Sequence, residues 1–225
     1  LDTRKEPSSD IVTEARNLGI EIKYSYVVVA AKGYKKVKSA DIAKISDNKK
    51  DLSNIENIEC DCICVSGFWT PSIHLASQSG NKSEFNEKID AFIPKKSKQK
   101  ENTIGSANGK FTLEETINEA FNKGYEVSNK ITENNNKVSI PTVVEKKSTE
   151  HDKFWCVPLP KGKSYKRFLD FQNDVAVTDI ELALREGFRS IEHVKRYTTL
   201  GMATDQGKTS NLNGLQLVSD IENKV

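Results

Sequence analysis

Residues 103–123, TIGSANGKFTLEETINEAFNK, contain the local pattern that does most to decide the fold. A short turn with glycine at each end, Gly105 and Gly109, runs directly into a segment whose apolar residues recur at helical spacing. Thr112 and Glu115 have the spacing of a capping box, in which both side chains satisfy backbone N–H groups at a helix start. The pattern therefore predicts a helix over residues 111–123 that follows a glycine turn.

Upstream of this turn, the apolar residues predict alternating helices and strands. The end of a strand is expected at residues 1–4, followed by a helix that begins at Ser9 or Asp10 and ends at Gly19. Strands are predicted over residues 20–31 and 35–45, and residues 47–57 are predicted to be a polar turn region.

Residues 59–66, ECDCICVS, form a nearly continuous apolar run that ends before Gly67. Such runs are typical of strands that are buried on both faces of a parallel sheet. A short helix or turn is predicted to start at residues 70–72, and a brief strand is predicted over residues 91–94. Together with the glycine turn, these elements predict an α/β fold.

The C-terminal part predicts a small helical bundle after an irregular connection. Residues 129–150 lack periodicity and are the best candidate for a boundary. Thr178 and Glu181 are spaced as a second capping box, so a helix is predicted over residues 178–186. Further helices are predicted over residues 190–200 and from Asn211 to the end of the sequence.

The overall charge excludes some classes of partner. The chain has 34 Lys and Arg against 32 Asp and Glu, a net charge of +2, so no strong field favours nucleic acid. No apolar run approaches the roughly 18 residues of a membrane span, and no signal pattern is present. We therefore expect no membrane association and a cytoplasmic location, and the initial Leu1 suggests that the sequence begins inside a longer protein.

Cysteine and histidine residues do not form a recognisable metal or catalytic pattern. Cys60, Cys62 and Cys64 share one face of a strand, and only His74 is near in sequence as a fourth ligand, so we expect small buried hydrophobic residues rather than a metal site. The other histidines have no spaced partner. We predict no metal ligand and no catalytic residue in this chain.

The C-terminal loop contains Gly207-Lys208-Thr209, which resembles the end of a phosphate-binding loop. The spacing excludes a nucleoside-triphosphatase motif, because five residues separate Gly201 from Gly207 and no strand is predicted before them. A helix start beside Lys208 still favours an anion. The basic and hydroxyl side chains of this region are Lys195, Arg196, Thr198, Lys208, Thr209 and Ser210, and they either bind a phosphate or only solvate the bundle.

Residues 168–215, FLDFQNDVAVTDIELALREGFRSIEHVKRYTTLGMATDQGKTSNLNGL, resemble the alpha subunit of heterotetrameric sarcosine oxidase. The earlier part of the chain resembles the dinucleotide-binding domain of the same subunit in the order of its motifs. These are the apolar run that ends before Gly67, then Trp69, Pro71 and His74, and then GSANG. The resemblance implies the C-terminal part of a two-dinucleotide-binding-domain flavoprotein fold, followed by a small helical domain like a cluster-free 2Fe-2S domain. It implies a partial FAD/NAD-binding domain at residues 1–130, a linker at residues 131–150 and the helical domain at residues 151–225.

By this resemblance, the chain is part of an oxidoreductase that demethylates sarcosine to glycine and transfers the one-carbon unit to tetrahydrofolate. NAD is implied on this subunit, FMN at its interface with the beta subunit, and FAD and tetrahydrofolate elsewhere in the complex. The implied partners are the beta, gamma and delta subunits. The alternative is a non-catalytic scaffold subunit of a related amino-acid or opine oxidase or dehydrogenase.

The resemblance also assigns binding roles to particular residues. Where FAD-binding relatives have Gly-Asp, this chain has Gly105-Ser106, which favours NAD over FAD, and Phe68 stands where the family often has a second glycine. Related iron–sulfur domains place cysteines where this chain has Asp170, Gln172, Asp205 and Ser210, so no cluster is expected. The residues expected to contact a cofactor are Gly67, Gly105, Ser106, Ala107, Asn108, Gly109, Phe111, Leu113, Lys195, Arg196, Lys208, Thr209 and Ser210.

Overall fold

The computed structural model describes residues 1–6, 10–67, 69–132, 139–143 and 154–223. The chain divides into two compact units, and the first is discontinuous in sequence because it combines Leu1–Cys64 with Asp152–Val225. The second unit is Val65–His151. This division by packing differs from the linear domain boundaries expected from the sequence, and part of the expected linker lies outside the described residues.

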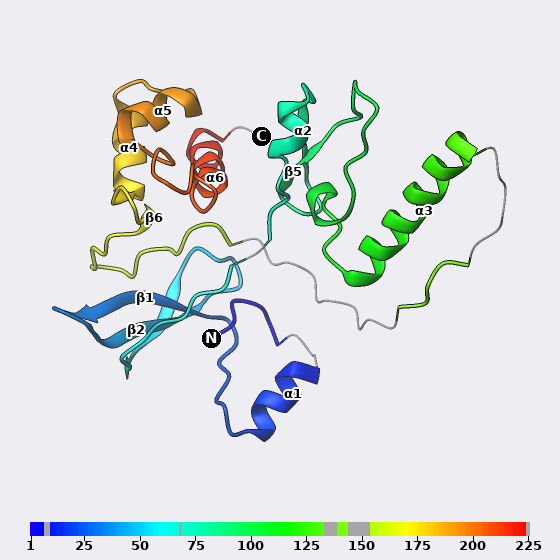
Figure 1. Ribbon diagram of the computed structural model, residues 1–225. Coiled ribbons are helices and arrows are strands. Elements are labelled where there is room, and N and C mark those ends of the chain that lie inside the picture. The colour runs from blue at the N-terminus through cyan, green and yellow to red at the C-terminus, as the bar shows by residue number, and fades with distance from the viewer. Residues whose placement is uncertain (7–9, 68, 133–138, 144–153, 224–225) are drawn as a thin grey trace. The chain divides into compact units, whose positions relative to one another are not determined.

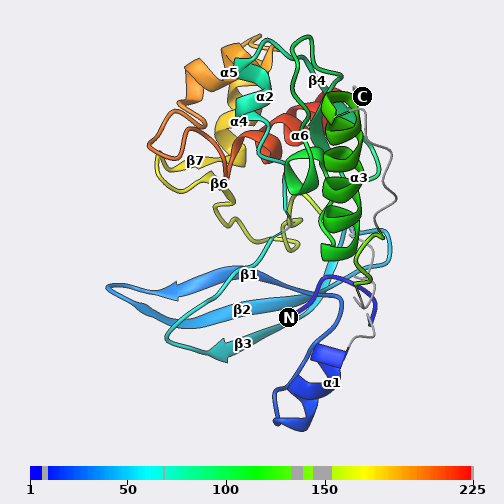
Figure 2. The ribbon, with the colours of Figure 1, turned by 45° about the vertical axis from the view of Figure 1, so that its right-hand side comes forward.

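The N-terminal half of the first unit is an antiparallel sheet (Figures 1 and 2). After α1 (Asp10–Asn17), the strands β1 (Tyr26–Gly33), β2 (Val37–Ile45) and β3 (Leu52–Glu59) pair in the order β1-β2-β3. The central strand β2 contributes most of the buried apolar residues of this sheet, which are Val27, Ala40, Ile42, Ala43 and Ile45.

Two sequence-based predictions in this region are wrong. Residues 47–57 contain most of β3 rather than a polar turn region. The sequence of β3, LSNIENIE, is poor in typical strand residues, and most of its side chains are exposed, including Ile55 and Ile58. It is a strand because its backbone pairs with β2. The strand predicted over residues 20–31 is present, but it begins at Tyr26.

The predicted buried strand over residues 59–66 is also wrong for this structure. The pairing with β2 ends at Glu59, and Cys60 makes the last backbone hydrogen bond to that strand, from its N–H to the Lys38 carbonyl at 3.1 Å. The described residues that follow have no regular secondary structure, and Val65 is 88% exposed. Between described residues, the pairing is antiparallel except for the isolated bridge Asp2–Tyr24.

The second unit contains the elements around the glycine turn. In order they are α2 (His74–Gln78), β4 (Ser83–Asn86), β5 (Ala91–Pro94), the 3₁₀ turn η1 (Gly105–Asn108) and α3 (Leu113–Thr132). Strands β4 and β5 form an antiparallel hairpin, confirming the strand predicted over residues 91–94.

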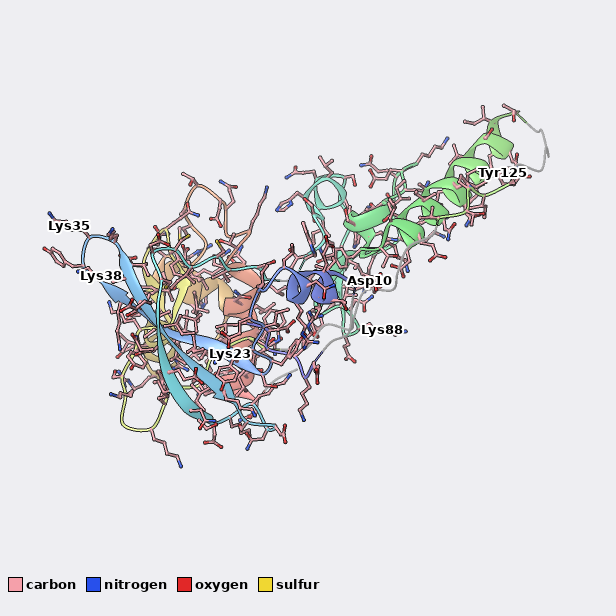
Figure 3. The ribbon with its side chains drawn as sticks, turned by 90° about the horizontal axis from the view of Figure 1, so that it is seen from below. Asp10, Lys23, Lys35, Lys38, Lys88 and Tyr125 are labelled. Atoms are coloured by element: carbon pink, nitrogen blue, oxygen red, sulfur yellow. The ribbon has the colours of Figure 1, made fainter. Side chains whose placement is uncertain are left out.

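Helix α3 continues nine residues beyond the predicted end at Lys123, to Thr132. Glu126 accepts from Lys123 at 2.8 Å and from Lys130 at 2.7 Å, and these two lysines lower the pKa of Glu126 to about 2. These contacts at i, i+3 and i, i+4 spacing support the additional turns, which also carry Tyr125, labelled in Figure 3. No helix in the described ranges is long and apolar enough to cross a membrane.

The C-terminal part of the first unit is the predicted helical bundle with a short hairpin. Strands β6 (Phe168–Asp170) and β7 (Val175–Ala176) lead into α4 (Val177–Arg185), followed by α5 (Ile191–Thr198) and α6 (Asn211–Glu222). One apolar core joins the hairpin and helices. Its buried members are Leu169, Val175, Val177, Ile180, Ala183, Val194, Leu200, Leu217 and Val218.

The predicted capping box at the start of α4 is displaced. The cap is Ala176, and its N–H donates to Asp179 Oδ2 at 2.8 Å, in place of the predicted pair Thr178 and Glu181. Alanine has no side-chain oxygen, so only one half of the reciprocal pair forms. The buried Val177 sets this helix start, because it must face the core.

A buried carboxylate ties the sheet to the C-terminal segment of the first unit. Asp41, on β2, is 4% exposed and accepts from Lys32 Nζ and Asn57 Nδ2, each at 2.8 Å. Tyr165 Oη also donates to Asp41, at 3.4 Å. The hydrogen bond from Lys32 is the largest cause that lowers the pKa of Asp41, followed by that from Asn57. A polar cluster therefore joins two parts of the first unit that lie far apart in sequence.

Candidate functional site

The glycine turn is a compact 3₁₀ turn whose shape requires glycine at its end. The N–H of Gly109 donates to the Ser106 carbonyl, and that of Lys110 to the Gly105 carbonyl, both at 3.1 Å. Gly109 has a φ of +77°, and a Cβ there would lie 2.7 Å from Ile89 Cδ1. Close packing on the neighbouring β4–β5 hairpin and the left-handed backbone both exclude larger residues.

The predicted capping box at the start of α3 is confirmed. The N–H of Glu115 donates to Thr112 Oγ1 at 3.2 Å, and the Thr112 hydroxyl contacts the Glu115 carboxylate at 3.0 Å. Phe111 is half-buried, while Leu113, the first residue of α3, is 56% exposed. The turn and the helix therefore follow each other as the sequence predicts.

Glu119, one turn further along α3, binds back to the glycine turn. Its Oε2 accepts from the Gly105 N–H at 2.6 Å, and its Oε1 accepts from Asn108 Nδ2 at 2.7 Å. A carboxylate of the chain itself thus occupies two donors, at Gly105 and Asn108, that the sequence predicts to contact a cofactor. No local sequence pattern points to Glu119, because it is 14 residues from Gly105 and only the return of the helix brings the two residues together.

The backbone N–H groups of Ser106 and Ala107 make no hydrogen bond to another residue in the described part of the chain. Ser106 is exposed and Ala107 is half-buried. These two groups are therefore the donors of the turn that remain available to an anion. Gly67 is exposed in irregular backbone, and the adjacent Phe68 lies outside the described residues.

The C-terminal candidate residues lie on two loops that bind each other. Asp170, 3% exposed, accepts from the N–H groups of Gln172 at 2.9 Å and Asn173 at 3.3 Å. Its other oxygen accepts from the buried Gly201 N–H at 2.8 Å. Thr204 Oγ1 donates to Gln172 Oε1 at 2.6 Å, which adds a second connection between the loops.

Asp205 organises the second loop. It accepts from the hydroxyl of Thr209 at 2.7 Å, from the N–H of Thr209 at 3.2 Å and from the N–H of Gly207 at 3.0 Å. The hydrogen bond from the Thr209 hydroxyl is the largest cause that lowers the pKa of Asp205, and the Gln172 side chain contributes too. Three of the residues at the positions of cluster cysteines, Asp170, Gln172 and Asp205, are therefore members of one hydrogen-bond network.

The predicted anion-binding residues of this loop differ in accessibility. Thr209 is committed to Asp205, and Ser210 is fully buried with no hydrogen-bond partner for Oγ among the described residues. Lys208 is exposed and forms no ion pair with a described residue. Lys195 and Arg196 lie in the last turn of α5, where positive charge stabilises the helix dipole. Lys208 is therefore an exposed candidate that is committed neither to Asp205 nor to the end of α5.

The cysteines are not the buried hydrophobic residues that the sequence predicts. Cys62 and Cys64 are exposed, with their sulfur atoms 3.9 Å apart, and Cys60 is half-buried. The neighbouring Cys64 is the largest cause that raises the pKa of Cys62. Among the described residues, no group of three or more His, Cys, Asp or Glu side chains is arranged to hold a metal ion.

Comparison with known proteins gives the family. Residues 164–225 match the sarcosine oxidase A3 domain. The chain is 34% identical to the sarcosine oxidase subunit alpha of Rhizobium meliloti over 169 residues, which are 73% of this chain and 16% of that protein. It is 29% identical over 195 residues to the corresponding subunit of Corynebacterium sp. strain U-96, covering 81% of this chain and 19% of that protein.

A solved structure supports the mixed α/β fold. The crystal structure of L-proline dehydrogenase from P. horikoshii matches with a TM-score of 0.51 and 20% identity, covering 96% of this chain and 43% of that one. At this identity the likeness concerns the fold alone. The A3 domain match and the named relatives show that the chain belongs to the family of sarcosine oxidase alpha subunits.

Proposed function

We propose that the chain is part of the alpha subunit of a heterotetrameric sarcosine oxidase, in which it binds NAD and contacts FMN. The observation that carries the proposal is the match of residues 164–225 to the sarcosine oxidase A3 domain. The complex would convert sarcosine to glycine and transfer the one-carbon unit to tetrahydrofolate. Its beta, gamma and delta subunits would be the partners, with the sarcosine-oxidising flavin on the beta subunit.

The glycine turn fits a dinucleotide phosphate only in part. The free N–H groups of Ser106 and Ala107 suit an anion, whereas the Gly105 N–H and the Asn108 amide already donate to Glu119. In our proposal, Ser106 and Ala107 hold the phosphate. When bound, NAD supplies a nicotinamide that exchanges hydride, while the chain contributes binding and orientation.

Substitution of Ser106 tests NAD binding. Because Ser106 is exposed, Ser106→Glu adds a negative charge at the turn without disturbing packing, and Ser106→Gln is the neutral control of similar size. We expect the Glu variant of the purified complex to retain less NAD than the Gln variant, which should match the unsubstituted protein. Equal NAD content in both variants would remove the glycine turn from the proposal.

Lys208 is our candidate for the FMN phosphate at the beta-subunit interface. It is exposed beside the start of α6, and an exposed lysine free of ion pairs can add a charge-assisted hydrogen bond to phosphate. We expect Lys208→Ala to lower FMN retention and electron transfer between flavins in the assembled complex. Lys161→Ala, another exposed lysine, is the control. Unchanged FMN retention in Lys208→Ala would leave only a surface role for Lys208.

The alternative is a cofactor-free scaffold within the same complex. The contact of Glu119 with Gly105 and Asn108 favours it, because the chain already satisfies two donors of the turn without a ligand. Native purification distinguishes the two functions, since the scaffold predicts no nucleotide in stoichiometric amount on this subunit.

A further inference from the structure

A lysine-rich loop connects β5 with the glycine turn. Its sequence over residues 95–102, KKSKQKEN, contains four lysines and one acidic residue, so its net charge of +3 exceeds the +2 of the whole chain. Lys95 lies 3.5 Å from the Glu84 carboxylate. The other three lysines are exposed and form no ion pair with a described residue. We call them the loop lysines, and they are Lys96, Lys98 and Lys100.

The carboxylate of Glu101 fixes this loop to the chain that follows α2. Its Oε1 accepts from Ser97 Oγ and from Asn81 Nδ2, each at 2.9 Å, and it also accepts from the hydroxyl of Ser79. Asn81 is 9% exposed, and its Oδ1 accepts from the Lys98 N–H at 3.2 Å. Side chains from two separate segments therefore hold the loop at several points.

Gln99 adds two further contacts that order the loop. Its backbone N–H donates to Ser97 Oγ at 3.0 Å, and its side-chain Nε2 donates to the Ser79 carbonyl at 2.9 Å. The loop therefore has a defined shape although its ammonium groups repel one another. Binding to an anionic surface costs less conformational entropy when the charged loop is ordered beforehand. This ordering distinguishes the loop from a connection that only keeps its lysines in water.

We propose that the loop lysines, held in place by Glu101, dock on an acidic segment of another subunit, where Asp or Glu carboxylates pair with them. This inference rests on the proposed function, which supplies the other subunits of the complex. Charge complementarity selects a carboxylate-rich partner. The loop has no aromatic side chain on which a base could stack and no apolar side chain that could enter a lipid surface, so nucleic acid and membranes fit it less well.

Two variants with the same change in charge test the docking surface. The loop variant replaces all three loop lysines with Gln. The control replaces Lys35, Lys36 and Lys38 with Gln at the tip of the β1–β2 hairpin, where Figure 3 labels Lys35 and Lys38; these lysines are also exposed and form no ion pair with a described residue. The affinity of the subunit for the rest of the complex is measured for both variants.

We expect the loop variant to bind the other subunits about tenfold more weakly than the unsubstituted subunit, and the control to stay within about twofold. The affinity of the loop variant should also depend less on salt, because fewer charged pairs are left to screen. Equal affinities of the loop variant and the control would overturn the proposal.

Removal of the Glu101 side chain separates the ordering of the loop from its charge. Glu101→Ala deletes the acceptor of three side-chain donors and also removes the one negative charge of the loop. If charge alone governed docking, this variant would bind the acidic segment more tightly. We expect it to bind about threefold more weakly, because the loop is no longer ordered before it binds. Tighter binding would contradict the positioning role of Glu101.

Carbodiimide crosslinking of the assembled complex identifies the occupant. The reagent joins a lysine nitrogen to a carboxylate carbon as an amide and takes up the water that is released, so it marks ion pairs covalently. We expect crosslinks from the loop lysines to Asp or Glu of another subunit. Crosslinks to a second copy of this chain, or nucleic acid that co-purifies with the subunit and is lost in the loop variant, would overturn the proposal. These outcomes do not depend on NAD or FMN content, so they are distinguishable from a failure of the proposed cofactor sites.

Discussion

The carboxylate of Glu119, within α3, accepts a hydrogen bond of 2.6 Å from the backbone N–H of Gly105. The same carboxylate holds the Asn108 side chain at 2.7 Å, so one residue fixes both ends of η1 against the helix that follows it. The turn therefore has a defined shape before any ligand binds. Its donors are divided between those used for folding and those left open at Ser106 and Ala107.

Removal of the Glu119 carboxylate should destabilise the second unit. Glu119→Ala leaves the Gly105 N–H and the Asn108 amide without their acceptor, and hydrogen bonds to a charged group contribute about 1.5–3 kcal/mol. We expect a loss of that size in the free energy of unfolding by urea. Glu14→Ala on α1 removes an exposed carboxylate and should change stability by less than about 0.5 kcal/mol. Equal losses in the two variants would contradict the role of Glu119.

Asp170 should be among the most sensitive polar residues of the C-terminal bundle. Asp170→Asn replaces an acceptor oxygen with an amide donor that faces N–H groups, so at least one of its three hydrogen bonds is lost. Because the site is buried, we expect a loss of about 2–4 kcal/mol, measured by chemical denaturation. Asp174→Asn, at an exposed position with φ +53° that asparagine tolerates, is the control. A loss as large in Asp174→Asn would show that charge alone, and not the network, is responsible.

Alanine substitutions at two glycines with left-handed backbone separate the cost of backbone strain from the cost of steric overlap. A Cβ at Gly201, with φ +67°, would overlap the Asn211 side chain, whereas at Gly187, with φ +96°, nothing lies within 4 Å. Both Gly201→Ala and Gly187→Ala should lose about 1 kcal/mol from backbone strain. Gly201→Ala should lose a further ~1–3 kcal/mol from overpacking, as measured by thermal melting. Similar melting temperatures for the two variants would show that Asn211 moves away freely.

The buried Asp41 should contribute to the loss of stability in acid. Its pKa is lowered from an ordinary value of 3.8, chiefly by the hydrogen bond from Lys32. The ionised Asp41 carboxylate therefore contributes its full share to the free energy of unfolding above pH 3.8. This contribution disappears as the pH falls through the lower pKa of Asp41 in the folded state. We expect Asp41→Asn to be less stable than the unsubstituted chain at pH 7, and the difference to shrink as the pH falls below 3.8 and through the lower pKa of the folded state.

Melting curves at several pH values measure this difference. Asp51→Asn, at an exposed position before β3, is the control and should show no such convergence. A constant difference between Asp41→Asn and the unsubstituted chain at every pH would mean that the charge of Asp41 is not the stabilising feature.

Several elements could be predicted from the sequence because their signals are local. The capping box of Thr112 and Glu115 lies within one helical turn, and the helices α5 and α6 have apolar residues at helical spacing. The family resemblance of residues 168–215 also rests on contiguous residues, and the A3 domain match confirms it. The cofactor residues stay a prediction, because their open donors suit a phosphate without identifying one.

The remaining features depend on contacts between distant residues. The polar strand β3 exists because β2 offers it a partner, and Glu119 reaches Gly105 because α3 returns to the turn. Asp170 is buried where it accepts from N–H groups of its own β6–β7 turn and from the Gly201 N–H, which lies 31 residues away in sequence. The amino-acid sequence by itself determined the caps, the helical periods and the family. Only the tertiary structure decided which polar groups satisfy each other and left the backbone of residues 61–66 outside the sheet, because pairing energy depends on neighbours that local sequence does not specify.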